Sequence, residues 1–185
     1  RLDMRMDRRQ ALTALEIVNT YEERPLADLF WRYGEERNSR RIAKHIVAAR
    51  PVETTGALKN AIASAVSQRF LTKTLARVFQ ALRIEVNSEL QNLGKALTDA
   101  LELLEPEGRM VVISYHSLED RIVKEFFKKE SARLIRSGHK FTPDITVVPR
   151  LQILTKKPVE PGDEELRVNP RGRSAKMRAA KRLPR

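Results

Sequence analysis

Apolar residues recur at helical spacing through most of the first half of the chain. From residue 11 to about residue 66 they form several short amphipathic segments, which are separated at Pro25, at Gly34 and between Pro51 and Gly56. A spacing of three or four residues places apolar side chains on one face of a helix. The pattern therefore predicts a small bundle of short helices in this part of the chain.

The strongest helical signal lies between Leu75 and Leu104, where large apolar residues recur every three or four positions. It predicts one long helix or two nearly collinear ones. Pro106 and Gly108 mark its end, and residues 109–115 then form a continuous apolar run of strand length, rich in β-branched residues. Such a run predicts a central, buried strand.

A polar turn and a second helix follow this strand. Ser117 stands three residues before Asp120, a spacing typical of a helix N-terminal cap. Helix, tight turn, strand and capped helix together make one unit of an α/β sheet. The architecture is therefore predicted to change near residue 73, from helices to an α/β domain. Weaker strand signals lie at residues 145–148, 151–154 and 175–183.

Composition narrows the class of protein. Of the 185 residues, 41% are hydrophobic and 32% charged, and no apolar run is long enough for a membrane span. The N-terminal ten residues also lack the features of a signal peptide. Cysteine is absent, and the three histidines, His45, His116 and His139, are too scattered for a local ligand cluster. We therefore expect a cytoplasmic protein with no metal.

The chain is strongly basic, with a formal net charge of +12 and a pI near 10.4. Nucleic acid is the first partner that such a charge indicates, with a merely solvated basic surface as the alternative. The chain opens on a charged stretch without an initiator methionine, so we also expect it to be a piece of a longer protein.

One predicted helix carries a basic face. Arg37, Arg40, Arg41 and Lys44 recur at helical spacing, and Trp31 precedes them closely. These residues can grip phosphates while the indole stacks on an unpaired base. The alternatives are a solvated helix surface for the four cations and a place in the core for Trp31.

The C-terminal segment is also rich in cations. Residues 167–185 hold eight basic residues and no acidic one, which suits a polyphosphate backbone and does not suit a buried strand. Pro170 would hold a turn that presents Arg171 and Arg173 to a partner. A disordered tail is the competing interpretation.

Longer blocks of sequence are more specific than these patterns. They are LDMRMD at residues 2–7, WRYGEERNSRRIAKHIV at 31–47, FQALRIEVNSEL at 79–90, GRMVVISYHSLEDRIVKEFF at 108–127 and NPRGRSAKMRAAKR at 169–182. In this order they resemble the MraW/RsmH family of bacterial methyltransferases. These enzymes use S-adenosylmethionine to modify the N4 amine of a cytosine in 16S ribosomal RNA.

The resemblance implies an α/β fold, with part of a Rossmann-like class I methyltransferase sheet and an inserted all-α domain. Residues 1–9 would be a remnant of the methyltransferase core. Residues 10–72 would form the helical substrate domain, and residues 73–185 the C-terminal part of the Rossmann-like domain. Small-subunit ribosomal RNA would be the partner and S-adenosylmethionine the cofactor.

Two departures from the family matter. Its glycine-rich cofactor loop, the acidic residue that reads the ribose and its strand-four active-site motif all precede the LDMRMD block. We therefore expect no cofactor-binding residue in this chain, and no activity from the chain alone. Residues 67–83 also lack the family's usual His-Pro-Ala-Thr-Arg-Thr pattern, which leaves the contacts there open.

Four residues are candidates to line the substrate pocket. His116 follows the predicted strand at the sheet edge where α/β folds bind ligands, although it could simply hydrogen-bond a nearby loop. In the LDMRMD block, an extended strand would put Asp3 and Arg5 on one face; alternatively, an Arg5 ion pair orients a loop. Asn169, in the closing block, completes the set.

Arg83 and Asn87 lie four residues apart on the long predicted helix. They suit a polar pair turned toward a domain junction, or a tie between the helix and a loop. A second function also remains open, namely a non-catalytic RNA-binding module with the sheet as scaffold. An upstream half carrying a cofactor loop would favour the enzyme over the module.

Overall fold

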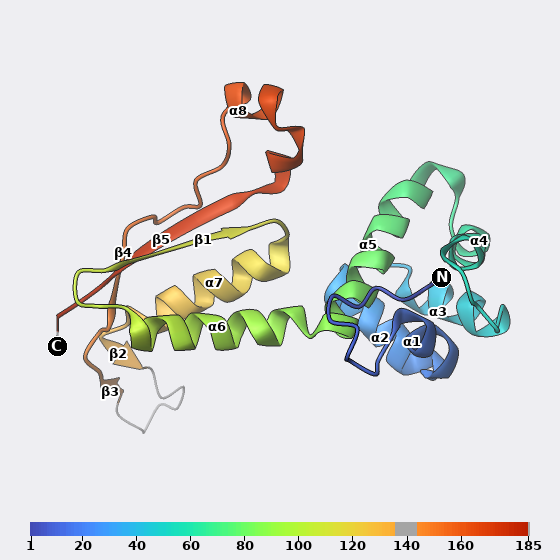
Figure 1. The fold of residues 1–185 in the computed structure, drawn as a ribbon, viewed down its shortest axis with the longest axis horizontal. Coiled ribbons are helices and arrows are strands. Elements are labelled where there is room, and N and C mark those ends of the chain that lie inside the picture. Colours follow the sequence, from blue (N-terminus) through green and yellow to red (C-terminus); the bar gives the residue numbers. More distant parts are fainter. Residues whose placement is uncertain (136–143, 185) are drawn as a thin grey trace. The chain divides into compact units, whose positions relative to one another are not determined.

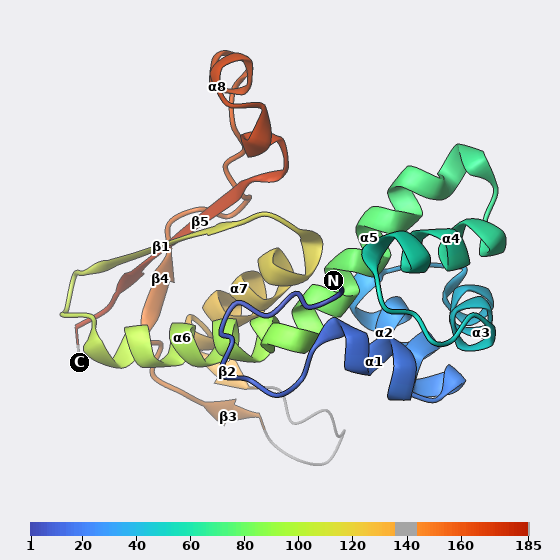
Figure 2. The same cartoon turned by 45° about the vertical axis from the view of Figure 1, so that its right-hand side comes forward.

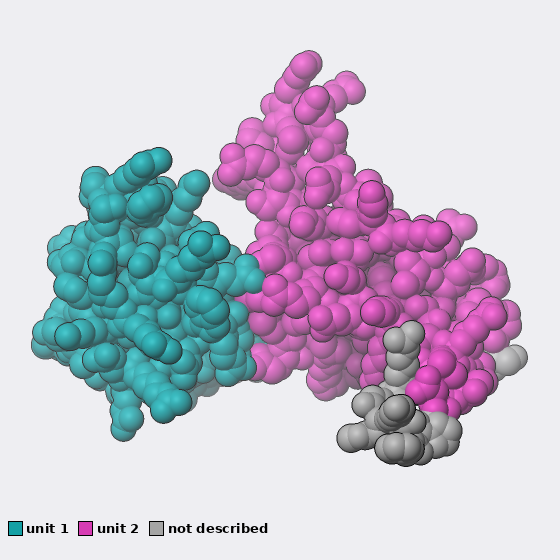
Figure 3. Space-filling model, turned by 180° about the vertical axis from the view of Figure 1, so that it is seen from behind, with its two compact units in different colours: residues 1–89 teal, residues 90–185 magenta. Residues whose placement is uncertain are grey.

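A computed structural model describes residues 1–135 and 144–184, and His139 lies outside these residues. The chain divides into two compact units, Arg1–Glu89 (unit 1, teal in Figure 3) and Leu90–Arg185 (unit 2, magenta). The fold is mixed α/β and mostly helical. Within the described residues, no helix is both long and apolar enough to cross a bilayer.

The described residues of unit 1 form a helical bundle, as the periodicity predicts. The helices are α1 (Ala14–Thr20), α2 (Glu23–Gly34), α3 (Ser39–Ala48), α4 (Thr55–Ala65) and α5 (Gln68–Asn87). Helix α2 packs against α3 and α5, and α4 also contacts both of these helices (Figure 1). The largest fully buried side chains of the bundle include Leu2, Ile17, Leu26, Phe30, Ile42, Ile46, Leu58, Ile62, Leu82 and Ile84.

Local sequence explains where these helices begin and how closely they pack. Thr13 and Glu16 form a capping box at the start of α1, and the Thr54 hydroxyl accepts the hydrogen bond that caps α4. Gly34 ends α2, as predicted. A Cβ atom at Gly34 would lie 2.8 Å from the Arg77 carbonyl oxygen, so only glycine permits this approach of α2 to α5.

The long helical signal forms two helices, not one. Ser88, with φ 49°, adopts a left-handed conformation between α5 and α6 (Glu89–Leu103). The expected change of architecture at residue 73 falls inside α5, which packs with α2 and α4 in unit 1. The division into a core remnant, a substrate domain and a methyltransferase domain stays a prediction.

Unit 2 contains a three-stranded antiparallel sheet in the order β1-β5-β4. Its strands are β1 (Arg109–Ser114), β4 (Leu151–Ile153) and β5 (Lys176–Arg182), and β2 (Leu134–Ile135) pairs separately with β3 (Ile145–Thr146). The three weaker strand signals are therefore confirmed. Helix α6 and α7 (Ser117–Glu130) run along the same face of the sheet (Figure 1).

The sheet packs on these helices through alternate side chains. The core comprises Leu97, Leu101, Met110, Val123, Phe127, Leu151 and Ala180. Met110 lies opposite Ala180, and Val112 lies opposite Arg178, so the inner face of β5 carries Arg178, Ala180 and Arg182. The prediction that the basic C-terminal segment is unsuited to a buried strand is wrong. Arg178 and Arg182 are both buried in β5, and each has hydrogen-bond partners.

The prediction of a central, buried β1 is also wrong for the described sheet. Strand β5 is the middle strand, and β1 lies at the edge. Val111 and Ile113, on the outer face of β1, are each 55% exposed. A continuous apolar run is typical of a strand covered on both faces, whereas in the described chain the helices cover one face.

An arm extends from the sheet of unit 2. It carries α8 (Asp163–Val168) and the short 3-10 helix η1 (Pro170–Ser174), and both views show it reaching away from the sheet (Figures 1 and 2). Val159 and Met177 pair at its base. The arm therefore presents its tip to solvent.

Candidate nucleic-acid interface

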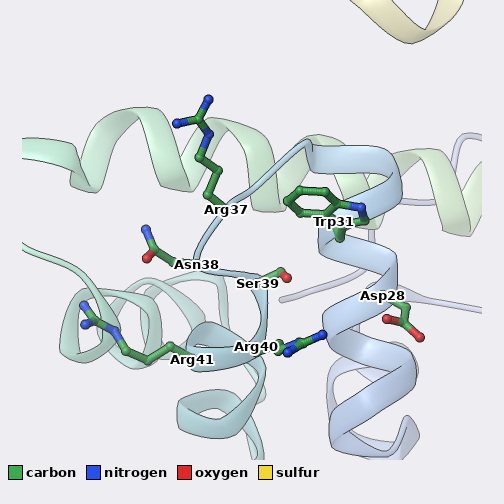
Figure 4. A pocket seen from close by; sticks show the side chains of 7 residues that line it. All are labelled: Asp28, Trp31, Arg37, Asn38, Ser39, Arg40 and Arg41. Carbon is green, nitrogen blue, oxygen red and sulfur yellow. The ribbon is translucent and has the colours of Figure 1, made fainter.

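A cavity of about 540 Å³ opens on unit 1 at the start of α3. Side chains from α2, from the connecting turn and from the first turn of α3 line it (Figure 4). They are Asp28, Trp31, Arg37, Asn38, Ser39, Arg40 and Arg41. The structure thus brings together, around one cavity, the predicted tryptophan and three of the four predicted helix cations.

Trp31 lies on the outer face of α2. Its side chain is 59% exposed, whereas the neighbouring Phe30 is fully buried. The indole projects toward the segment that carries Arg37, Asn38 and Ser39 (Figure 4). A core position for Trp31 is therefore the wrong interpretation, because Phe30 and the residues on its face already fill the core.

A buried carboxylate organises the turn that presents the arginines. Glu36 is 1% exposed, and its Oε1 accepts the backbone N–H of Asn38 at 2.9 Å. Its Oε2 lies 3.4 Å from Nη1 of Arg77 on α5. Glu35, with φ 49°, directs the chain out of α2 into this turn. Sequence reasoning missed Glu36, because its role depends on contacts with Asn38 and with Arg77 of α5 in the folded chain.

The N-terminus of α3 faces the same cavity. Asn38 precedes the helix without a side-chain cap, so the first backbone N–H groups of α3 add partial positive charge beside Ser39 and Arg40. Arg41 is held in place, since its Nε donates to the Ala65 carbonyl. Lys44 is exposed on α3 but does not line the cavity. An anion would meet both side-chain and helix-end charge here.

The LDMRMD block forms a folded loop, so the predicted extended strand is wrong. Met4 has φ 67°, which reverses the chain. The Arg5 guanidinium donates to both carboxylate oxygens of Asp3, at 2.7 and 3.0 Å, and to the Gln10 carbonyl at 2.7 Å. This hydrogen-bonded pair lowers the pKa of Asp3 to about 2. The alternative of an Arg5 ion pair that orients a loop is confirmed.

Asn87 clamps this loop to α5. Its Nδ2 donates to the Met4 carbonyl at 2.9 Å, and its Oδ1 accepts the Met6 N–H at 2.8 Å. The side chain is nearly buried, and a second Nδ2 contact reaches the Arg83 carbonyl within α5. Arg83 itself pairs with Glu89 at 2.8 Å. Of the two predicted roles for Arg83 and Asn87, Asn87 fulfils the tie between helix and loop.

His116, and not Ser117, caps α7. Its Nδ1 accepts the Glu119 N–H at 3.3 Å, and Ser117 is the first helical residue. The Glu119 carboxylate in turn accepts the Tyr115 N–H at 2.9 Å. An imidazole nitrogen can replace the hydroxyl acceptor that the Ser117–Asp120 spacing indicates. The hydrogen bond that His116 accepts comes from the first turn of α7, and a role for His116 in a substrate pocket stays a prediction.

Two of the C-terminal cations serve the fold. Arg178 forms a two-point pair with Asp120 of α7, at 2.7 and 3.0 Å, and lowers the pKa of that carboxyl. Arg182 donates through Nη1 to the carbonyls of Leu101 and Leu104 at the end of α6. A disordered tail is therefore wrong for β5.

The tip of the arm carries the remaining motif cations. Pro170 begins η1, and Arg171 and Arg173 are exposed on it, as the sequence predicts. Asn169 is exposed between α8 and η1. Of the four pocket candidates, Asp3 and Arg5 belong to unit 1, whereas His116 and Asn169 belong to unit 2.

An exposed indole, clustered arginines and an open helix N-terminus are typical of surfaces that bind single-stranded nucleic acid. The sequence itself specifies the family. Residues 1–183 match the MraW methylase family, so the chain belongs to that family. The resemblance drawn from the five sequence blocks is thereby confirmed.

Individual relatives carry one name, Ribosomal RNA small subunit methyltransferase H. The protein of Acaryochloris marina is 48% identical over 187 residues, which cover 99% of this chain and 57% of the relative. That of Chloroherpeton thalassium is 49% identical over 189 residues, which cover 98% and 59%. That of Thermomicrobium roseum is 47% identical over 194 residues, which cover 98% and 57%. The chain thus spans somewhat more than half the length of these relatives.

Proposed function

We propose that this chain is the RNA-binding and C-terminal part of a cytoplasmic methyltransferase. The whole enzyme would transfer a methyl group from S-adenosylmethionine to the N4 amine of a cytidine in 16S ribosomal RNA. Family membership and the names of the relatives support the reaction class. The cavity around Trp31 supports the substrate class, because it combines a stacking surface with three arginines.

We expect the S-adenosylmethionine site to lie outside this chain. Strand β1 leads directly into helix α7, and Tyr115 and His116 make this connection without a glycine. The first turn of α7 is acidic, with Glu119 and Asp120. We assign the cofactor site and the remaining strands of a Rossmann-like sheet to sequence that the relatives have in addition. His116, Asp3, Arg5 and Asn169 stay proposed pocket residues.

The 185-residue chain should not bind S-adenosylmethionine at micromolar affinity, and a protein of the relatives' full length should. Isothermal titration calorimetry of both proteins with S-adenosylmethionine measures the difference. Micromolar binding by the shorter chain would contradict the assignment of the cofactor site. Transfer of a methyl group by the longer protein to small ribosomal subunits tests the reaction itself, and its absence would favour the non-catalytic RNA-binding module.

RNA recognition requires an accessible base. An amine engaged in base pairing can neither reach an active site nor attack a methyl donor, so the target cytidine must be unpaired or flipped out. Within unit 1, Trp31 can stack on one base while Arg37 and Arg40 contact the adjacent phosphates. The chain carries a net charge of +12, which is complementary to the negative phosphates of RNA.

Charge reversal of Arg171 and Arg173 should weaken RNA binding and flatten its salt dependence. Both side chains are exposed on η1. The slope of log K against log salt concentration is negative, and each lost phosphate contact reduces its magnitude by about 0.7 for single-stranded RNA. Fluorescence anisotropy with a labelled single-stranded RNA, measured over a range of salt concentrations, gives this slope.

Lys128→Glu/Lys129→Glu is the matched control, because it makes the same charge change at exposed positions of α7. It should lower affinity less and leave the slope nearer the wild-type value. An unchanged slope in the Arg171→Glu/Arg173→Glu variant would mean that the arm does not contact phosphates.

A further inference from the structure

We propose that the cavity around Trp31 selects an unpaired guanine base of the bound RNA, and that Asp28 recognises the edge of this base. The inference deepens the proposed function and rests on it, since it assumes that RNA binds in this cavity. The volume of about 540 Å³ lies within the range of ligand sites. Among the described residues that line the cavity, Asp28 alone is acidic.

Asp28 and Trp31 are neighbours on the surface of α2. They lie three residues apart on this helix, a spacing that separates Cβ atoms by about 5–6 Å. Both side chains project from α2, and both line the cavity (Figure 4). A base that stacks on the exposed indole of Trp31 therefore brings one of its edges within reach of the Asp28 carboxylate.

The charged side chains at this cavity are available to a ligand. Within residues 1–135 and 144–184, neither Asp28 nor Arg37 nor Arg40 takes part in a hydrogen bond or an ion pair. Asp28 and Arg40 do not pair with each other, although both also line an adjoining cavity of unit 1. One carboxylate and two guanidinium groups can thus bind different parts of one ligand.

The carboxylate of Asp28 gives the cavity a preference among the bases. A carboxylate near phosphates lowers the affinity for RNA unless it accepts hydrogen bonds from the RNA. Its two oxygens accept best from two parallel N–H groups. Guanine presents such a pair on one edge, through N1–H and the N2 amine, whereas adenine, cytosine and uracil have no two adjacent nitrogen donors. The chemistry of Asp28 therefore matches guanine.

The cations of the cavity suit the phosphate end of the same nucleotide. Arg37 and Arg40 are exposed, and the first backbone N–H groups of α3 add partial positive charge beside them. The indole would contact the face of the base, the carboxylate its edge, and the arginines the phosphates on either side. Together these groups define a site for one guanosine nucleotide within single-stranded RNA.

The test compares three short, uridine-rich single-stranded RNAs that carry guanosine, inosine or adenosine at one position. Inosine differs from guanosine only in the missing N2 amine. Anisotropy titrations use the 185-residue chain, its Asp28→Ala variant and Glu22→Ala as the matched control. Glu22 is also an exposed carboxylate at α2, but it lies outside the cavity and its side chain makes no capping hydrogen bond.

Wild-type protein should bind the guanosine RNA about tenfold more tightly than the inosine RNA, as expected for one hydrogen bond to a charged acceptor. The adenosine RNA should bind no better than the inosine RNA. Asp28→Ala should lower affinity for the guanosine RNA about tenfold and abolish the preference. It should not weaken binding of the adenosine RNA, because it removes a negative charge near the phosphates. Glu22→Ala should keep the preference within about twofold of wild type.

Equal binding of the guanosine and inosine RNAs by wild type, or an unchanged preference in Asp28→Ala, would overturn guanine selection while RNA binding stands. Failure of the wild-type chain to bind any of the three RNAs would overturn the proposed RNA-binding function as well, so the two failures are distinguishable. If Asp28→Ala does not fold, Asp28→Asn decides, because it keeps the shape of the side chain, loses one of the two acceptors and should also reduce the preference for guanosine.

Discussion

Arg178→Met is expected to lower the free energy of unfolding by about 2 kcal/mol, because it leaves the half-buried Asp120 carboxylate without its two-point partner. The two side chains are only 9% and 13% exposed, and they join β5 to α7 through two hydrogen bonds. Urea denaturation followed by circular dichroism measures the loss. Hydrogen exchange should assign it to the amides of β1 and β5.

The loss of stability caused by Arg178→Met should be smaller at low pH. Arg178 lowers the pKa of Asp120 from its ordinary value of 3.8, so the stabilisation is complete above that value and is lost as the pH falls through the lowered pKa. Lys181→Met is the control on the same strand, since its partner Glu107 is 59% exposed, and it should cost less than about 1 kcal/mol. Equal losses in the two variants would contradict a special role for Arg178.

The second large expected effect is a loss of affinity for RNA. Trp31→Ala is expected to lower affinity for single-stranded RNA by about tenfold or more, because base stacking on an aromatic ring contributes about 1–3 kcal/mol. The fold should remain intact, since the indole is 59% exposed. The salt slope should not change, because no charge is lost. Anisotropy titrations over a range of salt concentrations measure both quantities.

Phe70→Ala provides the matched control for Trp31. Phe70 is also an exposed aromatic residue, 52% accessible, but it lies outside the cavity. Its replacement should change affinity by less than about twofold. Arg37→Glu/Arg40→Glu should instead reduce both affinity and slope. A Trp31→Ala variant that binds like wild type would remove stacking at this cavity from the proposed function.

Much of the fold could be predicted from local patterns. The bundle, the stop at Gly34 and all the described strands of unit 2 except β2 follow from periodicity and turn residues. The position of β1 could not be predicted, because an apolar run does not specify which strand pairs with it or which face is covered. The burial of Arg178 could not be predicted either, because its partner Asp120 lies on a different element.

Some residues of the candidate sites could also be predicted from the sequence, and others could not. Trp31 and the arginines could be found because they are close in sequence and of types that bind nucleic acid. Glu36 and Asn87 could not, because their roles depend on contacts with residues far along the chain. Asp3 and Arg5 were singled out for their charge, yet they pair with each other and shape a loop whose two methionines, Met4 and Met6, line a cavity.

The register of β5 also has a consequence for protein synthesis. Residues 109–114 pair with residues 176–182, and Arg182 completes the hydrogen bonding at the end of α6. The sheet of unit 2 therefore cannot close until Arg182 has left the ribosome. The helices of unit 1 rest on contacts among residues 1–89 and can assemble while unit 2 is still being translated.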